Sequence, residues 1–542
     1  MRWLNPLKLS QSWIEPNWRI YLQSQQPKLW FLAIIIGLMV SCAAILFRLG
    51  IGAVQWLWLG TNSENIVTAA HNTPDWIIIA APTIGGLVVG IFLDRIHPIK
   101  RAEGVADVIE ARAHNGKGLR LWQGIDSAAV TIVSLGSGAS AGREGPIVHL
   151  GASLASLICR TFSLNPTSKK TLIACGVASA VSASFNAPIA GVLFAHEVIL
   201  GHYALTAFVP IVLSSAFGTV LSRVYFGDIA AFNIPAYQIT SYWEMPAFAL
   251  LGLTCAIVAV LFQFSLMGTD WVARQIKIPL ILRPVIGGFA VGCIALVFPE
   301  VLGVGYEATD KALHQQLPIA LMFALIIAKT AATSITLASR FGGGIFSPSL
   351  YIGAMTGGTF GLIAAQVFPE MASSHGLYAI LGMGAVAASV LGAPVSTTMI
   401  VFELTGGYAL SIALLLTVSI ATGITLALHG RSYFHWQLEM RGIFLHSGAH
   451  RFLVTQVTVA QFYKPLPKET SEEDRLLPEG TQTIRLMDNL EAALKQFDAV
   501  GGADIAVADP NREGYIIGWA QHVDALRHFN QMLIRTQEEE HR

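Results

Sequence analysis

A run of apolar residues from 28 to 60, interrupted only by Arg48 in its second half, limits the folds open to this chain more than any other feature. At 1.5 Å per helical residue, the run is longer than a bilayer core is thick, so the helix must tilt or protrude. Residues 77–96 form a second run of this kind. We therefore expect an all-α polytopic membrane protein.

The composition excludes several other classes of protein. Of 542 residues, 53% are hydrophobic and 13% are charged, which is untypical of a soluble globule. Lys plus Arg (34) equals Asp plus Glu (34), so no basic surface for nucleic acid is indicated. The five cysteines lie in apolar runs without CxxC spacing, which favours core residues over disulfides or metal ligands. The first long apolar run is too long for a cleavable signal peptide.

The apolar pattern divides the chain into segments. Residues 1–27 mix aromatic and aliphatic with polar residues, which is typical of an amphipathic helix on a membrane surface. Between 102 and 225 the apolar pieces are short and separated by Gly or Pro. A membrane protein tolerates such broken segments only where protein or a water-filled cavity surrounds their ends. Long segments resume at 244–298, and broken ones follow to 428.

The composition changes after residue 429. Residues 430–442 are typical of a charged amphipathic helix, and 443–480 include a Pro-rich, acidic linker. Residues 481–542 are predicted to form a small α/β tail, with helices at 490–497 and 523–533 and strands at 505–508 and 515–519.

Two anchors indicate an internal repeat. Gly142–Pro146 and Gly344–Pro348 share their Gly and Pro positions, and Gly176–Glu197 corresponds in the same way to Gly382–Glu403. The offsets are 202 residues (344 minus 142) and 206 residues (382 minus 176). Duplicated halves with broken helices are typical of transporters whose site lies where the halves meet.

Glu144 is the first candidate for a functional residue. Pro146 fits the first turn of a helix, and a helix start directs free N–H groups and a positive dipole end at what precedes it. This is an anion site, and Glu144 lies at its mouth as a tethered anion.

These motifs, together with Phe185–Pro188 and Phe402–Gly406, resemble those of the CLC family of chloride channels and chloride/proton antiporters over about 28–442. The resemblance implies a homodimer with one anion pathway per subunit. It also implies two inverted repeats, about 28–225 and 244–428, and a gating role for Glu144. The tail resembles one CBS motif, and 452–463 resembles the start of another.

The resemblance also implies a set of anion-binding positions. Backbone N–H groups suit chloride, because they replace its hydration shell without adding a full charge. The positions expected to bind the anion are Gly145, Ile345, Phe346, Glu103 and Phe434.

Two of those positions depart from the family pattern. Glu103 replaces a coordinating serine, and a glutamate there could repel anions, carry protons or face the cytoplasmic mouth. Phe434 replaces a coordinating tyrosine and offers no hydroxyl, although Tyr433 is adjacent. We expect weaker anion binding in the inner half of the pathway.

The position of the inner proton relay also departs from the family pattern. Antiporters carry two glutamates after the Phe-Asn-Ala-Pro helix, whereas this chain has Glu197 followed by Val198. Valine has no titratable atom, and His196 is the nearest substitute. The candidates for a proton relay are therefore His196, Glu197 and Val198.

We expect a passive chloride channel gated by Glu144, and not an enzyme. The alternatives are a chloride/proton antiporter with a non-standard internal proton route and a sensor of anion occupancy with little flux. Fluoride or nitrate as the substrate is less favoured. The expected partners are chloride, protons and the lipid bilayer of the plasma (inner) membrane, with a cytoplasmic tail. No metal, cofactor or nucleic acid is expected, and the tail should bind adenine nucleotides weakly or not at all.

Overall fold

A computed structural model describes the chain outside residues 1–5, 114–117, 228–236, 238, 371, 406–409, 445–456, 468–470, 473–474, 478–480, 511, 513 and 542. It forms two compact units, Met1–Phe434 and His435–Arg542. Part of the expected second CBS motif and Gly406 lie outside the described residues. The first unit is helical and the second contains a small sheet, which confirms the predicted fold class.

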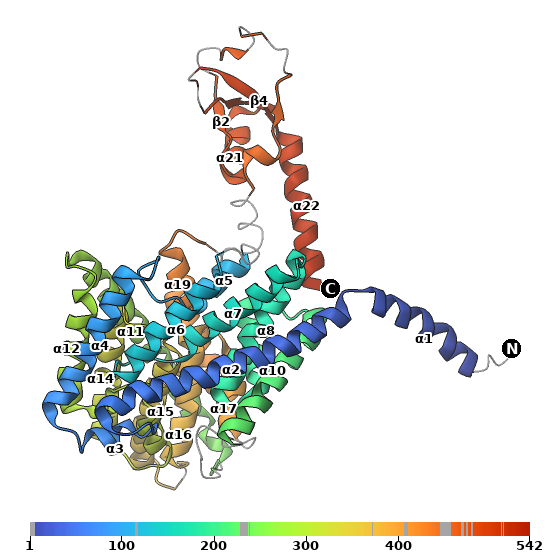
Figure 1. Cartoon of the computed structure of the whole chain (residues 1–542). Coiled ribbons are helices and arrows are strands. Elements are labelled where there is room, and N and C mark those ends of the chain that lie inside the picture. The colour runs from blue at the N-terminus through green and yellow to red at the C-terminus, as the bar shows by residue number, and fades with distance from the viewer. Residues whose placement is uncertain are drawn as a thin grey trace. The chain divides into compact units, whose positions relative to one another are not determined.

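The first half of the helical unit follows the expected order of long and broken segments (Figure 1). Asn165 begins α8 as a helix cap, because its side chain accepts the N–H of Ser168 at 2.8 Å. The elements are α1 (Pro6–Gln23), α2 (Gln26–Leu59), α3 (Ile66–Ala70), α4 (Asp75–Arg95), α5 (Val105–Ala113), α6 (Leu121–Gly136), α7 (Glu144–Thr161), α8 (Pro166–Phe185), α9 (Pro188–Phe194), the π-helical turn η1 (Ala195–Leu200) and α10 (Leu205–Phe226).

The second half repeats this order. A short helix, α13, again precedes a long one, and the helix that begins two residues after the motif glycine, α15, again packs against its successor. The elements are η2 (Tyr242–Glu244), α11 (Met245–Gln275), α12 (Leu282–Val297), η3 (Pro299–Val301), α13 (Tyr306–Leu313), α14 (Ile319–Ala338), α15 (Phe346–Val367), α16 (His375–Leu391), α17 (Pro394–Thr405), α18 (Ser411–His429) and α19 (Tyr433–Glu439).

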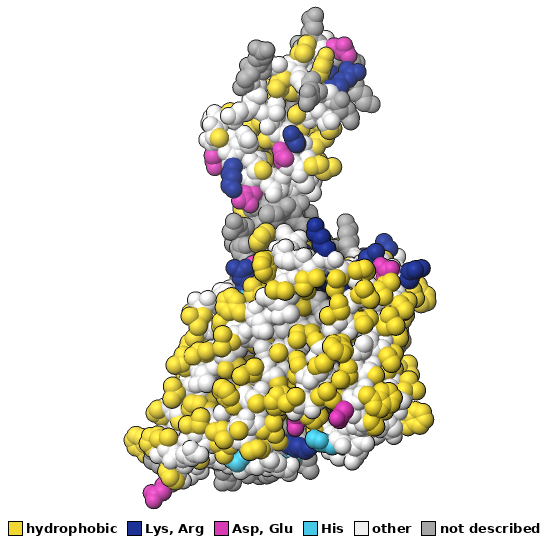
Figure 2. Space-filling view, turned by 90° about the vertical axis from the view of Figure 1, so that its left-hand side faces the viewer, with side chains coloured by type: hydrophobic (Ala, Val, Ile, Leu, Met, Phe, Trp, Pro, Cys, Tyr) yellow, Lys and Arg dark blue, Asp and Glu magenta, His cyan; other side chains and the backbone are white. Residues whose placement is uncertain are grey.

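Among the described residues, seven helices are long and apolar enough to cross a membrane. The face drawn in Figure 2 carries a broad band of hydrophobic side chains over this unit, and Lys and Arg gather at one edge of the band. Large apolar side chains of this unit are exposed, among them Leu57 and Val224 at 75% and 78%. Such a surface requires lipid rather than water around it, so the protein is a multi-pass membrane protein.

Equivalent helices of the two repeats pack against each other. Helix α4 packs against α12, and α9 against α17. A Cβ at Gly86 would lie 2.2 Å from the Pro284 carbonyl oxygen, and a Cβ at Gly288 would lie 2.1 Å from that of Pro82. Only glycine permits this approach, which places two backbones in direct contact as small residues do between membrane helices. The contact is reciprocal, as expected for two inverted repeats.

The second unit has a four-stranded sheet of order β1-β4-β3-β2. β2 (Thr483–Arg485) and β3 (Asp504–Ala508) are parallel, whereas β4 (Ile516–Gln521) pairs antiparallel with β3 and with β1 (Lys464–Pro465). Asn489 caps α21 (Leu490–Val500) by accepting the Ala492 N–H at 2.8 Å, and α22 (His522–His541) ends the unit. Its core residues include Val457, Phe462, Ile484, Leu490, Phe497, Ile505 and Val507.

The predicted helices and strands of the tail are present with longer bounds, and two strands are additional. β1 falls in the stretch expected to be a linker. A strand of two residues has no alternating pattern, so the sequence did not indicate it. Val457 and Val459, just before it, are buried in the core of this unit.

Candidate functional site

The two repeats meet backbone to backbone at their glycine motifs. The Gly142 N–H donates to the Gly344 carbonyl at 2.7 Å, and the Gly344 N–H donates to the Gly142 carbonyl at 2.7 Å. α7 and α15 begin two residues after these glycines, at Glu144 and Phe346. Two positive helix ends therefore start at one buried junction in the membrane.

The Glu144 carboxylate lies in this junction, where its side chain is 1% exposed. Oε1 accepts a hydrogen bond from the Ser347 hydroxyl at 2.5 Å and from the Tyr306 hydroxyl at 3.3 Å. Oε2 lies 3.4 Å from the Ser347 N–H, in the first turn of α15. A carboxylate of repeat 1 is thus held by neutral donors at a helix N-terminus of repeat 2, where an anion is stabilised.

Three of the other expected anion-binding residues lie at the same junction. A Cβ at Gly145 would lie 3.4 Å from the Gly344 Cα, so the two motifs are in contact there. Ile345 and Phe346 are each 3% exposed, and the Phe346 ring packs against Phe185 with centroids 4.9 Å apart. Their backbone segment immediately precedes Ser347.

Phe434 and Tyr433 begin α19 in the first unit. Both are buried, and their rings contact each other edge to face with centroids 6.3 Å apart. The described contacts of Phe434 do not connect it to Glu144.

Glu103 lies beside α7 and contacts a residue that the sequence analysis missed. Its carboxylate Oε2 is 3.9 Å from Nε2 of His149, and the side chains are 6% and 1% exposed. The Glu103 N–H donates to the Ser127 hydroxyl at 3.0 Å, and Gly104 approaches Gly145, with 3.9 Å between its added Cβ and the Gly145 carbonyl carbon. His149 lies one helical turn after Gly145, and an ionisable residue in an apolar helix was the signal that could have identified it.

Glu197 caps a helix of the other repeat. Its carboxylate accepts the N–H groups of Val395 and Ser396 at 3.0 and 2.7 Å and the Ser396 hydroxyl at 2.6 Å. Glu403 does the same in reverse, accepting the Ile189 and Ala190 N–H groups at 3.0 and 2.7 Å. These reciprocal caps satisfy the free N–H groups that begin α17 and α9.

His196 lies in the π-helical turn η1, and Val198 follows two residues later in the same turn. Nδ1 of His196 is 3.2 Å from the His202 carbonyl oxygen, and its ring stacks on Tyr203 with centroids 5.6 Å apart. Nε2 is buried and has no hydrogen-bond partner among the described residues. The histidine is thus fixed on one side by a backbone contact.

Lys329 is a second residue that the sequence analysis missed. It lies in α14 with its side chain fully buried, and it donates to the carbonyls of Val301 and Gly303 at 3.0 and 2.9 Å. Its Nζ is 5.1 Å from the centre of the Tyr351 ring. These contacts fix the loop that leads to Tyr306, the partner of Glu144. The sequence feature that could have identified Lys329 is a lysine inside an otherwise apolar run.

In the tail, Asp524 lies in the first turn of α22. Its carboxylate pairs with Lys464 and with Arg527, each at 2.8 Å. The hydrogen bond from Lys464 and the two positive charges hold the pKa of Asp524 below its usual range. Lys464 also donates to Gln521, so this carboxylate is already paired within the tail.

No group of three or more His, Cys, Asp or Glu residues that could hold a metal occurs in the described part of the chain. The junction between the repeats consists of buried helix ends, hydroxyl groups and one carboxylate. It lies inside a multi-pass membrane protein with duplicated halves. This combination defines a membrane transport protein for small anions.

The comparisons identify the family. Residues 85–426 match the family model described as voltage gated chloride channel. The ClcB-like chloride channel protein of Ralstonia nicotianae is 31% identical over 386 residues, which cover 70% of this chain and 90% of that protein. Chloride channel protein CLC-f of Arabidopsis thaliana is 30% identical over 431 residues, or 74% of this chain and 54% of the plant protein. The chain belongs to the voltage gated chloride channel (CLC) family, which assigns it to membrane transport rather than to enzyme catalysis.

Solved structures share the fold. A slow cyanobacterial Cl⁻/H⁺ antiporter has a TM-score of 0.69 at 22% identity, over 77% of this chain and 99% of the other. A CLC-type fluoride/proton antiporter has a TM-score of 0.61 at 21% identity, over 74% of this chain and 95% of the other.

Proposed function

We propose that the protein carries chloride through the junction of α7 and α15 and that Glu144 is its gate. The observation that carries this proposal is the Glu144 carboxylate, which lies buried at the N-terminus of α15 among neutral O–H and N–H donors. An anion and this carboxylate compete for the same donors. When Glu144 is protonated it loses its charge, and chloride takes its place beside the N–H groups of Gly145, Ile345 and Phe346.

The distribution of charged residues indicates which loops face the outside and which face the cytoplasm. The segment between α2 and α4 contains Glu64 and no Lys or Arg, whereas Lys100 and Arg101 follow α4. Positive residues collect on the cytoplasmic side of membrane proteins. The loop at 60–74 therefore faces outward, and residues 97–104 face the cytoplasm together with the chain that follows α18, where Arg431 and Arg441 lie. The homodimer that the resemblance implies remains a prediction.

We further propose that chloride movement is coupled to protons. Exchange requires ionisable groups on both sides of the anion position. Glu144 supplies one, and the buried pair Glu103 and His149, 3.9 Å apart and alongside Gly145, supplies the other. The backbone N–H of Glu103 donates to the Ser127 hydroxyl, which lies 3.5 Å from Nε2 of His97. The solved structures with the same fold include proteins described as antiporters, and this supports coupled exchange over the passive channel expected from Val198.

The passive channel is the second candidate, and one observation favours it. Val198 carries no proton, and the neighbouring Glu197 carboxylate is engaged by three donors of α17. If neither Glu103 nor His196 replaces the missing glutamate, Glu144 alone gates a conductive path.

The experiment measures proton movement in liposomes that contain the full-length protein and experience only a chloride gradient. The proposal predicts uphill proton movement in the wild type and none in Glu144→Gln. Glu103→Gln and His149→Gln should each lower the number of protons moved per chloride while chloride flux continues. His196→Gln is the matched control for an inner histidine outside this pair and should keep the ratio.

Chloride flux without proton movement in the wild type would establish the passive channel. Loss of coupling in His196→Gln, with Glu103→Gln and His149→Gln unaffected, would move the inner proton route to η1 and reject the Glu103–His149 pair.

A further inference from the structure

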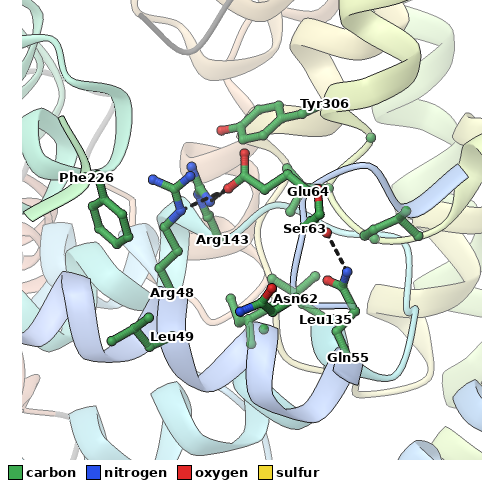
Figure 3. Close-up of a pocket in the computed structure, with 16 residues that line it drawn as sticks. Arg48, Leu49, Gln55, Asn62, Ser63, Glu64, Leu135, Arg143, Phe226 and Tyr306 are labelled. Atoms are coloured by element: carbon green, nitrogen blue, oxygen red, sulfur yellow. Dashed lines mark hydrogen bonds and ion pairs between the residues drawn. The ribbon is translucent and has the colours of Figure 1, made fainter. Parts of the chain in front are cut away.

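A pocket of about 270 Å³ lies between the carboxyl-terminal half of α2, the 62–66 loop and the start of α13 (Figure 3). It belongs to the side of the molecule that the charge distribution places outside. Tyr306, which donates to the Glu144 carboxylate, forms part of its wall. The pocket is thus next to the proposed gate but separate from the helix ends that bind the anion.

Two guanidinium groups converge on one oxygen in this pocket. Arg48 Nε and Arg143 Nη1 lie 3.0 and 2.7 Å from Oε1 of Glu64. Figure 3 shows the three side chains meeting, with Arg48 beside the ring of Phe226, whose centre is 4.2 Å from the guanidinium carbon. The lining contains two positive side chains and one negative one, so it has one excess positive charge.

Glu64 shows which ligand chemistry this pair accepts. It lies on a loop, its side chain is 41% exposed, and its carboxylate contacts only the two arginines among the described residues. Partial enclosure opposes its ionisation, but the charges of Arg143 and then Arg48 outweigh this and lower the pKa of Glu64. The pocket therefore already binds a tethered carboxylate, and Arg48, 40% exposed, is open to another one.

The remaining walls of the pocket determine which group attached to the carboxylate fits. Apolar side chains line the space beside the arginines, and the amides of Gln55 and Asn62 complete it. A guanidinium pair next to an apolar wall fits a carboxylate with a short hydrocarbon chain, whereas sulfate or phosphate would leave the wall without a partner. The apolar lining residues are Leu49, Ile51, Ile66, Leu135, Phe226 and Val304.

We propose that this pocket binds a small organic monocarboxylate from outside, which pairs with Arg48 and Arg143 in competition with Glu64. The assignment is independent of whether the protein exchanges chloride for protons or conducts it passively.

A ligand in the pocket influences the proposed gate, Glu144, through two contacts. The Arg143 guanidinium carbon lies 4.9 Å from the centre of the Tyr306 ring, and Tyr306 donates to Glu144 at 3.3 Å. A bound carboxylate adds a negative charge next to the path, which opposes the approach of chloride. External monocarboxylate should therefore slow chloride transport.

The test is calorimetry on the full-length protein in lipid nanodiscs at fixed chloride, with butyrate as the probe and butyramide as its neutral isostere. Butyrate should bind and butyramide should not. Arg48→Gln should weaken butyrate binding at least ten-fold, whereas Glu64→Gln, which removes the competing charge with almost no change of shape, should tighten it several-fold. Acetate and bicarbonate should bind more weakly than butyrate, because they lack the apolar chain.

Equal heats for butyrate and butyramide, or unchanged butyrate affinity in Arg48→Gln, would reject the site. Weaker binding in Glu64→Gln would show that Glu64 supports the ligand rather than competes with it, and would also reject the proposal. Bicarbonate binding as tight as that of butyrate would overturn the assignment to an organic acid. Gel filtration of both variants shows whether they fold, and Glu64→Gln keeps the test decisive if Arg48→Gln does not.

Discussion

Replacing Glu197 should destabilise the protein without uncoupling it, because the structure makes this carboxylate a helix cap. Glu197 accepts three hydrogen bonds from the first turn of α17, at 2.6, 2.7 and 3.0 Å. Hydrogen bonds to a charged group contribute about 1.5–3 kcal/mol each. Val395 is 50% exposed, so water replaces part of what Glu197→Ala removes, and we expect a loss of about 2–4 kcal/mol.

Two variants give a graded series. Glu197→Gln keeps a neutral acceptor, whose hydrogen bonds contribute about 0.5–1.5 kcal/mol each, so it should lose less than the alanine variant. Glu403→Ala removes two hydrogen bonds from the equivalent cap on α9 and should cost about two thirds as much as Glu197→Ala. The expected order of thermal stability is wild type, Glu197→Gln, Glu403→Ala and Glu197→Ala.

The assay has two readouts on the same preparations. Loss of monodisperse protein on heating in detergent gives the apparent melting temperature, and the liposome measurement gives protons moved per chloride. If Glu197 acts only as a helix cap, the variants should have lower melting temperatures and an unchanged number of protons moved per chloride. A Glu197→Gln variant that melts like the wild type but has lost proton coupling would refute this reasoning and make Glu197 the inner proton relay.

Four further outcomes follow from individual contacts. Glu144→Gln should leave chloride flux into liposomes insensitive to external pH; retained acid activation would exclude Glu144 as the gate. Lys329→Met leaves two buried carbonyls without a donor, at about 1–3 kcal/mol each, and should lower both the melting temperature and the apparent chloride affinity. Gly288→Leu should abolish the folded peak in gel filtration, since even a Cβ would lie 2.1 Å from a carbonyl oxygen of α4; a normal peak would contradict that packing. ATP should give no stoichiometric binding by calorimetry on the full-length protein, because Asp524 is paired with Lys464; tight binding would show that the pair opens.

The parts of the fold that the sequence predicted are those dictated by backbone geometry. Gly142 and Gly344 are constrained because the two motifs donate to each other through their N–H groups, so the same residues recur at the same spacing in both halves. Pro146 and Pro348 mark helix starts, since proline fits the first turn. Runs of apolar residues likewise predict spans without any knowledge of their neighbours.

The pairings between distant elements could not be predicted in this way. Glu103 and His149 meet because α5 packs beside α7, and neither residue's local sequence specifies that contact. Arg48, Glu64 and Arg143 come from a helix, a loop and a motif that only the folded unit brings together. One-dimensional patterns report periodicity and backbone limits, whereas these contacts depend on the packing of whole helices.

The symmetry of the framework makes one difference between the two motifs informative. Gly142 pairs with Gly344, and the two glutamate caps are exchanged between the repeats, so both halves present a helix start to the junction. At equivalent positions, however, repeat 1 carries Glu144 and repeat 2 carries Phe346. Two anion-stabilising helix ends therefore share a single built-in anion, which occupies the end of the opposite repeat. In the mechanism proposed above, protonation of that one carboxylate changes the charge at only one of the two helix ends, and this asymmetry is what a directional response to external acid requires.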